Sequence, residues 1–242
     1  MLHSLHPPPM KTLRQGLLGL AMLAMGCGAQ GQTALLTWDV NAINASTTPT
    51  FAGTPAAHIS GGNLTLGSGT TASSAANTFG GSGFNQTSFA SAITANDYIS
   101  VTITPSAGYS ISISGIDYLP GKASAGTVTF AADLTSSKTG YTSSNSLDSY
   151  SFTSGSAALR SITLSGIPSL QNITSSIEFR LYGYVVSGAA TDTFRIRNLT
   201  GNDLVISGTV SAIPEPSTYA AMLGVVALTG VMIHRRRLQR AA

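Results

Sequence analysis

The middle of the chain alternates apolar and polar side chains with a period of two, and this pattern restricts the fold more than any other feature. Ile99, Val101 and Ile103 alternate with serine and threonine, and Ile111 and Ile113 alternate with serines. Successive side chains of a strand point to opposite faces, so the pattern predicts strands with one buried face. The pattern continues at Val128, Phe130, Ile162, Leu164, Ile177, Phe179, Leu181, Phe194, Ile196 and residues 204–210.

Turn-forming residues separate these runs, at positions 105–108, 120–121 and 201–203. Roughly ten short strands with such turns favour an all-β fold, and we expect an antiparallel β-sandwich of jelly-roll type over residues 30–213. Helix is expected only at the two ends, as an N-terminal signal-peptide helix and a C-terminal single transmembrane helix. The irregular stretch 45–92 contains Phe51, Phe79, Phe84 and Phe89. We expect loops and short edge strands there, held to the sandwich by these rings.

The N-terminal segment has the layout of a secretory signal peptide. Lys11 and Arg14 precede an apolar run over residues 17–25, and small residues follow up to Ala29. We predict that signal peptidase removes residues 1–29. Two alternatives remain open here: translation starts at Met10, or Cys27 carries a lipid.

The C-terminal segment begins with Pro214, Glu215 and Pro216 and continues with an apolar run over residues 219–233. Fifteen helical residues span roughly 22 Å at about 1.5 Å each, against a hydrocarbon core of about 30 Å. The positively charged residues Arg235, Arg236 and Arg237 end the run, and they can reach the lipid headgroups. We therefore expect a short transmembrane helix over about 218–234, with the arginines on the cytoplasmic side.

This order of Pro-Glu-Pro, apolar stem and arginine cluster resembles the PEP-CTERM sorting signal of exported Gram-negative bacterial proteins. The resemblance implies that residues 214–242 are a sorting signal, that an exosortase-type membrane protease handles the chain at the inner membrane, and that the product reaches the cell surface or the extracellular polymer matrix. Residues 67–103 and 179–184 are similar to a β-domain that often precedes such tails, and this likeness extends over 37–211. It implies an architecture and no activity.

Charge is concentrated in the two end segments. The chain has a formal net charge of +3, but six of its twelve basic residues lie in the sorting segments. The middle then holds six basic and eight acidic residues, so its net charge is about −2 and it has no basic surface of the kind that binds nucleic acid. A cut after Ala29 leaves no cysteine, which excludes disulfides and thiolate metal sites.

The inventory of catalytic groups is poor, and we expect the protein not to be an enzyme. His58 is the only histidine between the sorting segments, and no Gly-x-Ser-x-Gly motif of a hydrolase occurs there. A pair of carboxylates acting as a glycosidase remains a distant alternative. We expect no cofactor. A structural calcium ion at Asn96 and Asp97, or at residues 201–203, is kept open against the simpler interpretation as turns.

Aromatic and arginine side chains give the remaining indication of a ligand. Trp38 alternates with apolar residues and is expected in the core. Tyr182 and Tyr184 share one strand face, provided that Gly183 introduces no bulge, and Arg195 and Arg197 share another. We expect these four residues as a ligand face for polysaccharide, with Tyr182 and Tyr184 as an exposed platform. The alternative is an ordinary solvated strand face.

Two hypotheses about function follow. The first is an exported, non-enzymatic protein of the cell surface or extracellular matrix, associated with exopolysaccharide or biofilm. The second is a carbohydrate-binding β-sandwich module, with or without calcium.

Overall fold

The computed structural model describes residues 33–123, 128–153, 155, 158–188, 193–198, 200–214 and 216–241. Several predictions lie outside the described residues: the signal peptide, the alternative start at Met10, the lipidation alternative at Cys27, and Glu215 of the predicted sorting motif. The described residues form a β-rich domain and a C-terminal helix.

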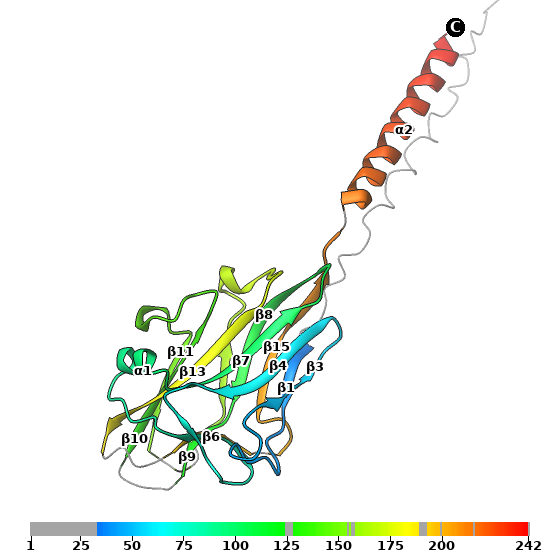
Figure 1. The fold of residues 1–242 in the computed structure, drawn as a ribbon. Helices are drawn as coiled ribbons and strands as arrows, with labels where there is room; N and C mark the ends of the chain where they lie inside the picture. Colours follow the sequence, from blue (N-terminus) through cyan, green and yellow to red (C-terminus); the bar gives the residue numbers. More distant parts are fainter. Residues whose placement is uncertain are drawn as a thin grey trace, which may run out of the picture. The chain divides into compact units, whose positions relative to one another are not determined.

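Two large antiparallel sheets enclose a common core (Figure 1). The five-stranded sheet consists, in spatial order, of β12 (Arg160–Thr163), β8 (Tyr109–Tyr118), β15 (Leu204–Ala212), β1 (Thr33–Trp38) and β3 (Thr54–Pro55). The six-stranded sheet consists of β11 (Asp148–Phe152), β10 (Thr129–Ser136), β13 (Ile177–Ser187), β7 (Tyr98–Pro105), β4 (Ile59–Leu66) and β2 (Phe51–Ala52). This arrangement confirms the predicted all-β, antiparallel fold and is consistent with a sandwich.

A smaller sheet of four strands adds to the same core. It consists, in order, of β5 (Thr71–Ala72), β6 (Thr78–Ser82), β14 (Phe194–Arg197) and β9 (Pro120–Lys122). Phe194 and Ile196 of β14 are fully buried in the main core. Their neighbours Arg195 and Arg197 therefore project from the opposite face of the strand.

The core follows the alternation seen in the sequence. Ile103, Ile113 and Phe179 are at most 1 % exposed, whereas Thr102 lies on the outer face. A cavity of about 20 Å³ remains between the sheets, roughly the space of one water molecule. Trp38 is buried as expected, and its indole Nε1 donates to the carbonyl of Gly62 at 3.0 Å.

The stretch 45–92 is more regular than the sequence predicts. It supplies β2 to β6, and β4 alone has eight residues. Phe79, Phe84 and Phe89 are buried and Phe51 is half-buried, so the four rings do attach this stretch to the sandwich. The glycines and asparagine in the middle of β4 hide its alternation, because they offer no apolar side chain for the pattern.

The expectation that helix occurs only at the chain ends is wrong. Helix α1 (Phe89–Ala95) lies within the domain, together with two short 3-10 turns, η1 (Ser143–Asn145) and η2 (Pro168–Leu170). Ser88 caps α1: its hydroxyl accepts from the backbone N–H of Ser91 at 3.2 Å, and the Ser91 hydroxyl accepts in return from the N–H of Ser88. Asn96 ends the helix with a left-handed φ of 62°. Both caps satisfy backbone groups that a helix end leaves unpaired.

An ion pair joins an edge of one large sheet to an edge of the other. The guanidinium of Arg160 on β12 donates to the Asp148 carboxylate on β11 through Nε at 3.1 Å and through Nη2. The hydroxyl of Tyr118 on β8 donates to the same carboxylate at 3.2 Å. Burial and the Asp148 charge raise the pKa of Tyr118, so its hydroxyl stays protonated. These contacts join β11, the edge strand of one large sheet, to β12, the edge strand of the other.

The C-terminal helix α2 (Pro216–Ala241) covers the apolar run and the arginines after it. No helix among the described residues is both long enough and apolar enough to cross a membrane. The prediction of a transmembrane helix over about 218–234 is corrected accordingly. Although the segment is helical, its apolar part over residues 219–233 has only fifteen residues, roughly 22 Å at about 1.5 Å each against a hydrocarbon core of about 30 Å.

Candidate functional site

The four residues expected as one ligand face occupy two different sheets. Tyr182 and Tyr184 lie on β13 in the six-stranded sheet, whereas Arg195 and Arg197 lie on β14 in the four-stranded sheet. The register of β13 against β10 is continuous through Gly183, so this glycine introduces no bulge and the two tyrosines do share a face. That face, however, is covered.

Helix α1 packs onto the tyrosine face. The Phe89 ring lies 5.5 Å from the ring of Tyr182 and 6.3 Å from that of Tyr184, measured between centroids. Tyr182 is 0 % exposed, and burial raises the pKa of its hydroxyl. The expectation that Tyr182 forms part of an exposed platform is therefore wrong, because a helix that the sequence pattern did not reveal covers it.

The rest of this outer face is also occupied by internal contacts. The Tyr184 hydroxyl donates to the buried Asp133 carboxylate at 2.8 Å, and burial followed by this hydrogen bond raises the pKa of Tyr184. The guanidinium of Arg180 lies between two tyrosine rings, 4.3 Å from the centroid of Tyr98 and 4.0 Å from that of Tyr141. We call this outer face of the six-stranded sheet, which carries Arg180, Tyr182, Tyr184 and Asp133, the closed face.

The two arginines of β14 line a polar hollow instead. The hollow has a volume of about 320 Å³. It is lined by Ala76, Asn77, Thr78, Ala123, Arg195, Arg197 and Asn198. We call it the arginine hollow, and it contains two of the four predicted ligand-face residues.

Glycines on both neighbouring strands shape the arginine hollow. Arg195 pairs with Gly80 on β6 and with Gly121 on β9. A Cβ atom at Gly121 would collide with the side chain of Arg197, and one at Gly80 would collide with the backbone of β14. The long arginine side chains can therefore lie across Gly80 and Gly121, because glycine has no side chain to exclude them.

Hydrogen bonds fix the orientation of the arginine and asparagine side chains. Nη1 of Arg197 donates to the carbonyls of Gly155 at 2.9 Å and Lys122 at 3.3 Å. Asn77 adopts a left-handed φ of 57°, and its Oδ1 accepts from the N–H of Ala42 at 2.7 Å. The N–H of Asn198 donates to the Asn77 carbonyl at 3.1 Å. The Arg195 side chain is 7 % exposed and its Nη2 donates to the Thr193 hydroxyl, whereas Arg197 is half-buried. Guanidinium groups in a polar concavity suit the carboxylate or sulfate groups of a ligand.

Three of the acidic side chains form structural contacts within the protein. Asp148 holds Arg160, Glu178 pairs with Arg180 at 3.0 Å and accepts from Tyr141, and Asp133 accepts from Tyr184. Asp97 differs, because it is 1 % exposed and its Oδ2 has no hydrogen-bond partner. Burial raises the pKa of Asp97 from 3.8 to about 6.

His58 lies on an exposed turn before β4, with a left-handed φ of 63°. Its ring stacks on Tyr109 at a centroid distance of 3.8 Å. The Ser106 backbone N–H donates to the His58 carbonyl at 2.9 Å. Among the described residues no side-chain hydrogen bond or ion pair joins the imidazole to a serine hydroxyl or a carboxylate, so a hydrolase triad is not assembled around it there.

The calcium alternative can be compared with the observed turns. Asn96 ends α1, and Asp203 accepts the backbone N–H of Val40 at 2.7 Å through Oδ2. Across the described ranges, no three His, Cys, Asp or Glu side chains group in a way that could hold a metal ion. The turn interpretation accounts for the contacts of Asn96 and Asp203.

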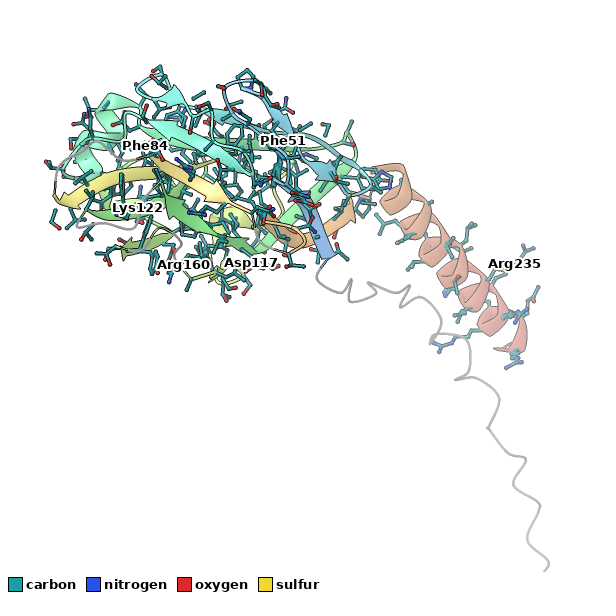
Figure 2. The ribbon with its side chains drawn as sticks, turned by 90° about the horizontal axis from the view of Figure 1, so that it is seen from below. Phe51, Phe84, Asp117, Lys122, Arg160 and Arg235 are labelled. Atoms are coloured by element: carbon teal, nitrogen blue, oxygen red, sulfur yellow. The ribbon has the colours of Figure 1, made fainter. Side chains whose placement is uncertain are left out.

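The predicted sorting residues lie just before α2, at its start and toward its end. Pro214 is exposed after β15, and Pro216 is the first residue of α2, a position that tolerates proline because no N–H is needed there. Arg235, Arg236 and Arg237 are exposed along α2, and Figure 2 labels Arg235 on that helix.

Comparison with known proteins adds no relative: no protein family, no curated protein and no solved structure matches the chain. The candidate site therefore depends on the geometry alone. Sequence patterns found Arg195 and Arg197, but they missed Asn77, Thr78 and Asn198. Asn198 directly follows Arg197 in the sequence, and this adjacency was the available signal. Asn77 and Thr78 come from a distant segment that pairs with β14.

Proposed function

We propose that this chain is an exported, non-enzymatic protein of the cell surface or extracellular matrix that associates with acidic exopolysaccharide. Its jelly-roll sandwich is the cargo, and the arginine hollow is the binding site. The observation that supports this most strongly is the pair Arg195 and Arg197 in a hollow of about 320 Å³. Planar guanidinium groups form paired hydrogen bonds with carboxylates, the charged groups of uronic-acid polymers.

The use of the acids supports a role without catalysis. Asp133, Asp148 and Glu178 are each engaged by a tyrosine or an arginine of the protein itself. A glycosidase needs two carboxyl groups that flank an open substrate position. Carboxylates held in internal contacts are poorly placed for that task.

The export part of the proposal rests on the two ends of the chain. Signal peptidase removes residues 1–29, and an exosortase-type protease at the inner membrane cuts within the sorting signal 214–242. Mass spectrometry of secreted material checks this: we expect a C-terminus close to residues 214–217. An extracellular species that still carries Arg240 would contradict sorting by this route.

Binding is tested with the full chain and a uronic-acid polymer such as alginate. Arg197→Ala should weaken retention on immobilised alginate about tenfold, the loss expected for a hydrogen bond to a charged group. Lys138→Ala, which removes one positive charge outside the hollow, is the matched control and should bind like the wild type. Equal binding by all three proteins would refute the arginine hollow as the site.

The alternative function is a carbohydrate-binding module with one defined ligand. The same hollow favours it, because a preformed concavity selects ligand shape as well as charge. An array of acidic glycans separates the two: strong retention of one structure indicates the module, whereas similar retention of many uronic-acid glycans indicates general association with matrix polymers.

A further inference from the structure

A second polar hollow lies on the outer face of the five-stranded sheet, where β12, β8 and β15 run side by side. Its volume is about 300 Å³. It is lined by Ser114, Gly115, Asp117, Ser161, Ile162, Thr163 and Ser207, and we call it the hydroxyl hollow. Figure 2 labels Asp117 of this hollow on β8 and Arg160 on the neighbouring strand β12. It shares no residue with the arginine hollow.

A break in strand register creates the floor of the hydroxyl hollow. Ser207 pairs with Gly115 whereas Gly208 pairs with Ile113, so Ser114 is an extra residue without a partner on β15. Such bulges bend a strand and redirect a side chain. Gly115 is required beside it, because a Cβ atom there would lie 2.7 Å from the Ile162 carbonyl oxygen.

The polar groups of this hollow are not used by the protein itself. The Oγ atom of Ser114 is buried without a hydrogen-bond partner. A buried hydroxyl without a partner costs free energy unless water or a ligand satisfies it. Within the described part of the chain, no hydrogen bond or ion pair is recorded for the side chains of Asp117, Ser161, Thr163 or Ser207. This contrasts with Asp133, Asp148 and Glu178, which are all engaged.

The chemistry of the lining restricts the ligand. One carboxylate accepts two hydrogen bonds from neighbouring hydroxyl groups, and the serine and threonine hydroxyls both donate and accept. A calcium ion usually takes six to eight oxygen ligands with several carboxylates, whereas Asp117 is the sole carboxylate of this hollow. No cationic side chain lines the hollow, so Asp117 disfavours an acidic sugar by like-charge repulsion.

We propose that the hydroxyl hollow binds the vicinal hydroxyl groups of an uncharged saccharide. This inference rests on the proposed function in so far as the chain works among extracellular polysaccharides. It assigns a different site and a different class of sugar. Asp117 and the exposed hydroxyls of Ser161 and Thr163 hold the saccharide hydroxyls, with Ser207 beside them.

The full chain is tested on an array that carries uncharged hexose oligosaccharides beside uronic-acid oligosaccharides. We expect Asp117→Asn to reduce affinity for the uncharged glycans about tenfold, by loss of a hydrogen bond to a charged acceptor. Affinity for uronic-acid glycans should be unchanged. Asp39→Asn is the matched control, because Asp39 is an exposed acid outside the hollow, and it should bind like the wild type.

Thr163→Ala guards against loss of folding. Removing an exposed hydroxyl should leave the melting temperature nearly unchanged, while affinity for uncharged glycans falls severalfold. Absence of binding to every uncharged glycan, or equal binding by Asp117→Asn and Asp39→Asn, would overturn this assignment. Retained binding of uronic-acid glycans in that case would leave the proposed function standing, whereas loss of both classes would refute both.

Discussion

The outer faces of the two large sheets have opposite characters. On the six-stranded sheet, Tyr182 is fully buried under α1, and Arg180 lies between two tyrosine rings. On the five-stranded sheet, Ser161 and Thr163 are exposed beside the hydroxyl hollow. The face richest in aromatic side chains is thus closed, and the face with small polar side chains is open. Aromatic residues on a strand do not by themselves indicate a binding surface, because they also offer the largest area on which another element can pack.

The largest expected effect is on the closed face. Tyr182→Ala removes a ring packed against Phe89 and Tyr98 and should lower the free energy of unfolding by about 3 kcal/mol. Thr163→Ala on the open face should change it by less than about 0.5 kcal/mol. Urea unfolding of both variants measures the difference. Similar small losses in the two would show that α1 does not pack firmly on β13.

Gly183→Ala tests how tightly the strand beneath α1 is packed against the core. The added methyl would lie 2.8 Å from the Phe194 ring and 2.9 Å from that of Phe84, and overpacking of this kind costs about 2 kcal/mol. Gly166→Ala is the control, because a Cβ there meets no atom within 4 Å. A fully stable Gly183→Ala protein would contradict this packing.

Asp97 makes the stability of the region at the end of α1 depend on pH. Its pKa is about 6 in the folded protein and near 3.8 when unfolded, so the unfolded state ionises first as pH rises. Stability should therefore fall between about pH 4 and pH 6 and then level off, by about 1 to 2 kcal/mol after allowance for solvent screening. Asp97→Asn should flatten this part of the profile. An unchanged profile in Asp97→Asn, measured by thermal unfolding, would assign the dependence to other groups.

The smallest effect concerns the cap of α1. Ser88→Ala removes the acceptor for the N–H of Ser91 and should destabilise the helix by about 1 kcal/mol, which opens the closed face locally. Hydrogen exchange of the α1 amides should accelerate severalfold. Thr94→Ala, in the same helix and also exposed, should not accelerate it. Equal exchange in both variants would mean that tertiary contacts alone hold α1.

The sequence predicts the strands whose alternation is unbroken, and it predicts little of what covers them. β7, β8 and β13 follow directly from their β-branched and aromatic residues at every second position. α1 was missed because its short run of alanine, serine and threonine lacks a helical stripe, although Ser88, Ser91 and Asn96 are typical capping residues. The shared face of Tyr182 and Tyr184 was predictable from β13 alone. Its closure was not, since it depends on Phe89, far away in the sequence.

The same distinction holds for the candidate sites. Arg195 and Arg197 could be found because they alternate with buried residues on β14. The walls supplied by Asn77 and Thr78 could not, because pairing between distant segments brings them beside Arg197 and Asn198. The bulge at Ser114 is likewise a property of how β8 aligns with β15, and alternation in one strand carries no information about a register shift against another.

The position of β15 determines how force on the C-terminal segment would enter the domain. This last strand lies in the interior of the five-stranded sheet, hydrogen-bonded to β8 on one side and to β1 on the other. A pull along β15 through residue 213 loads the ladder with β8 first, over residues 209–212, and then both ladders over residues 204–208. A cargo tethered by its tail and held elsewhere by a polymer would resist extraction through the strength of that central placement.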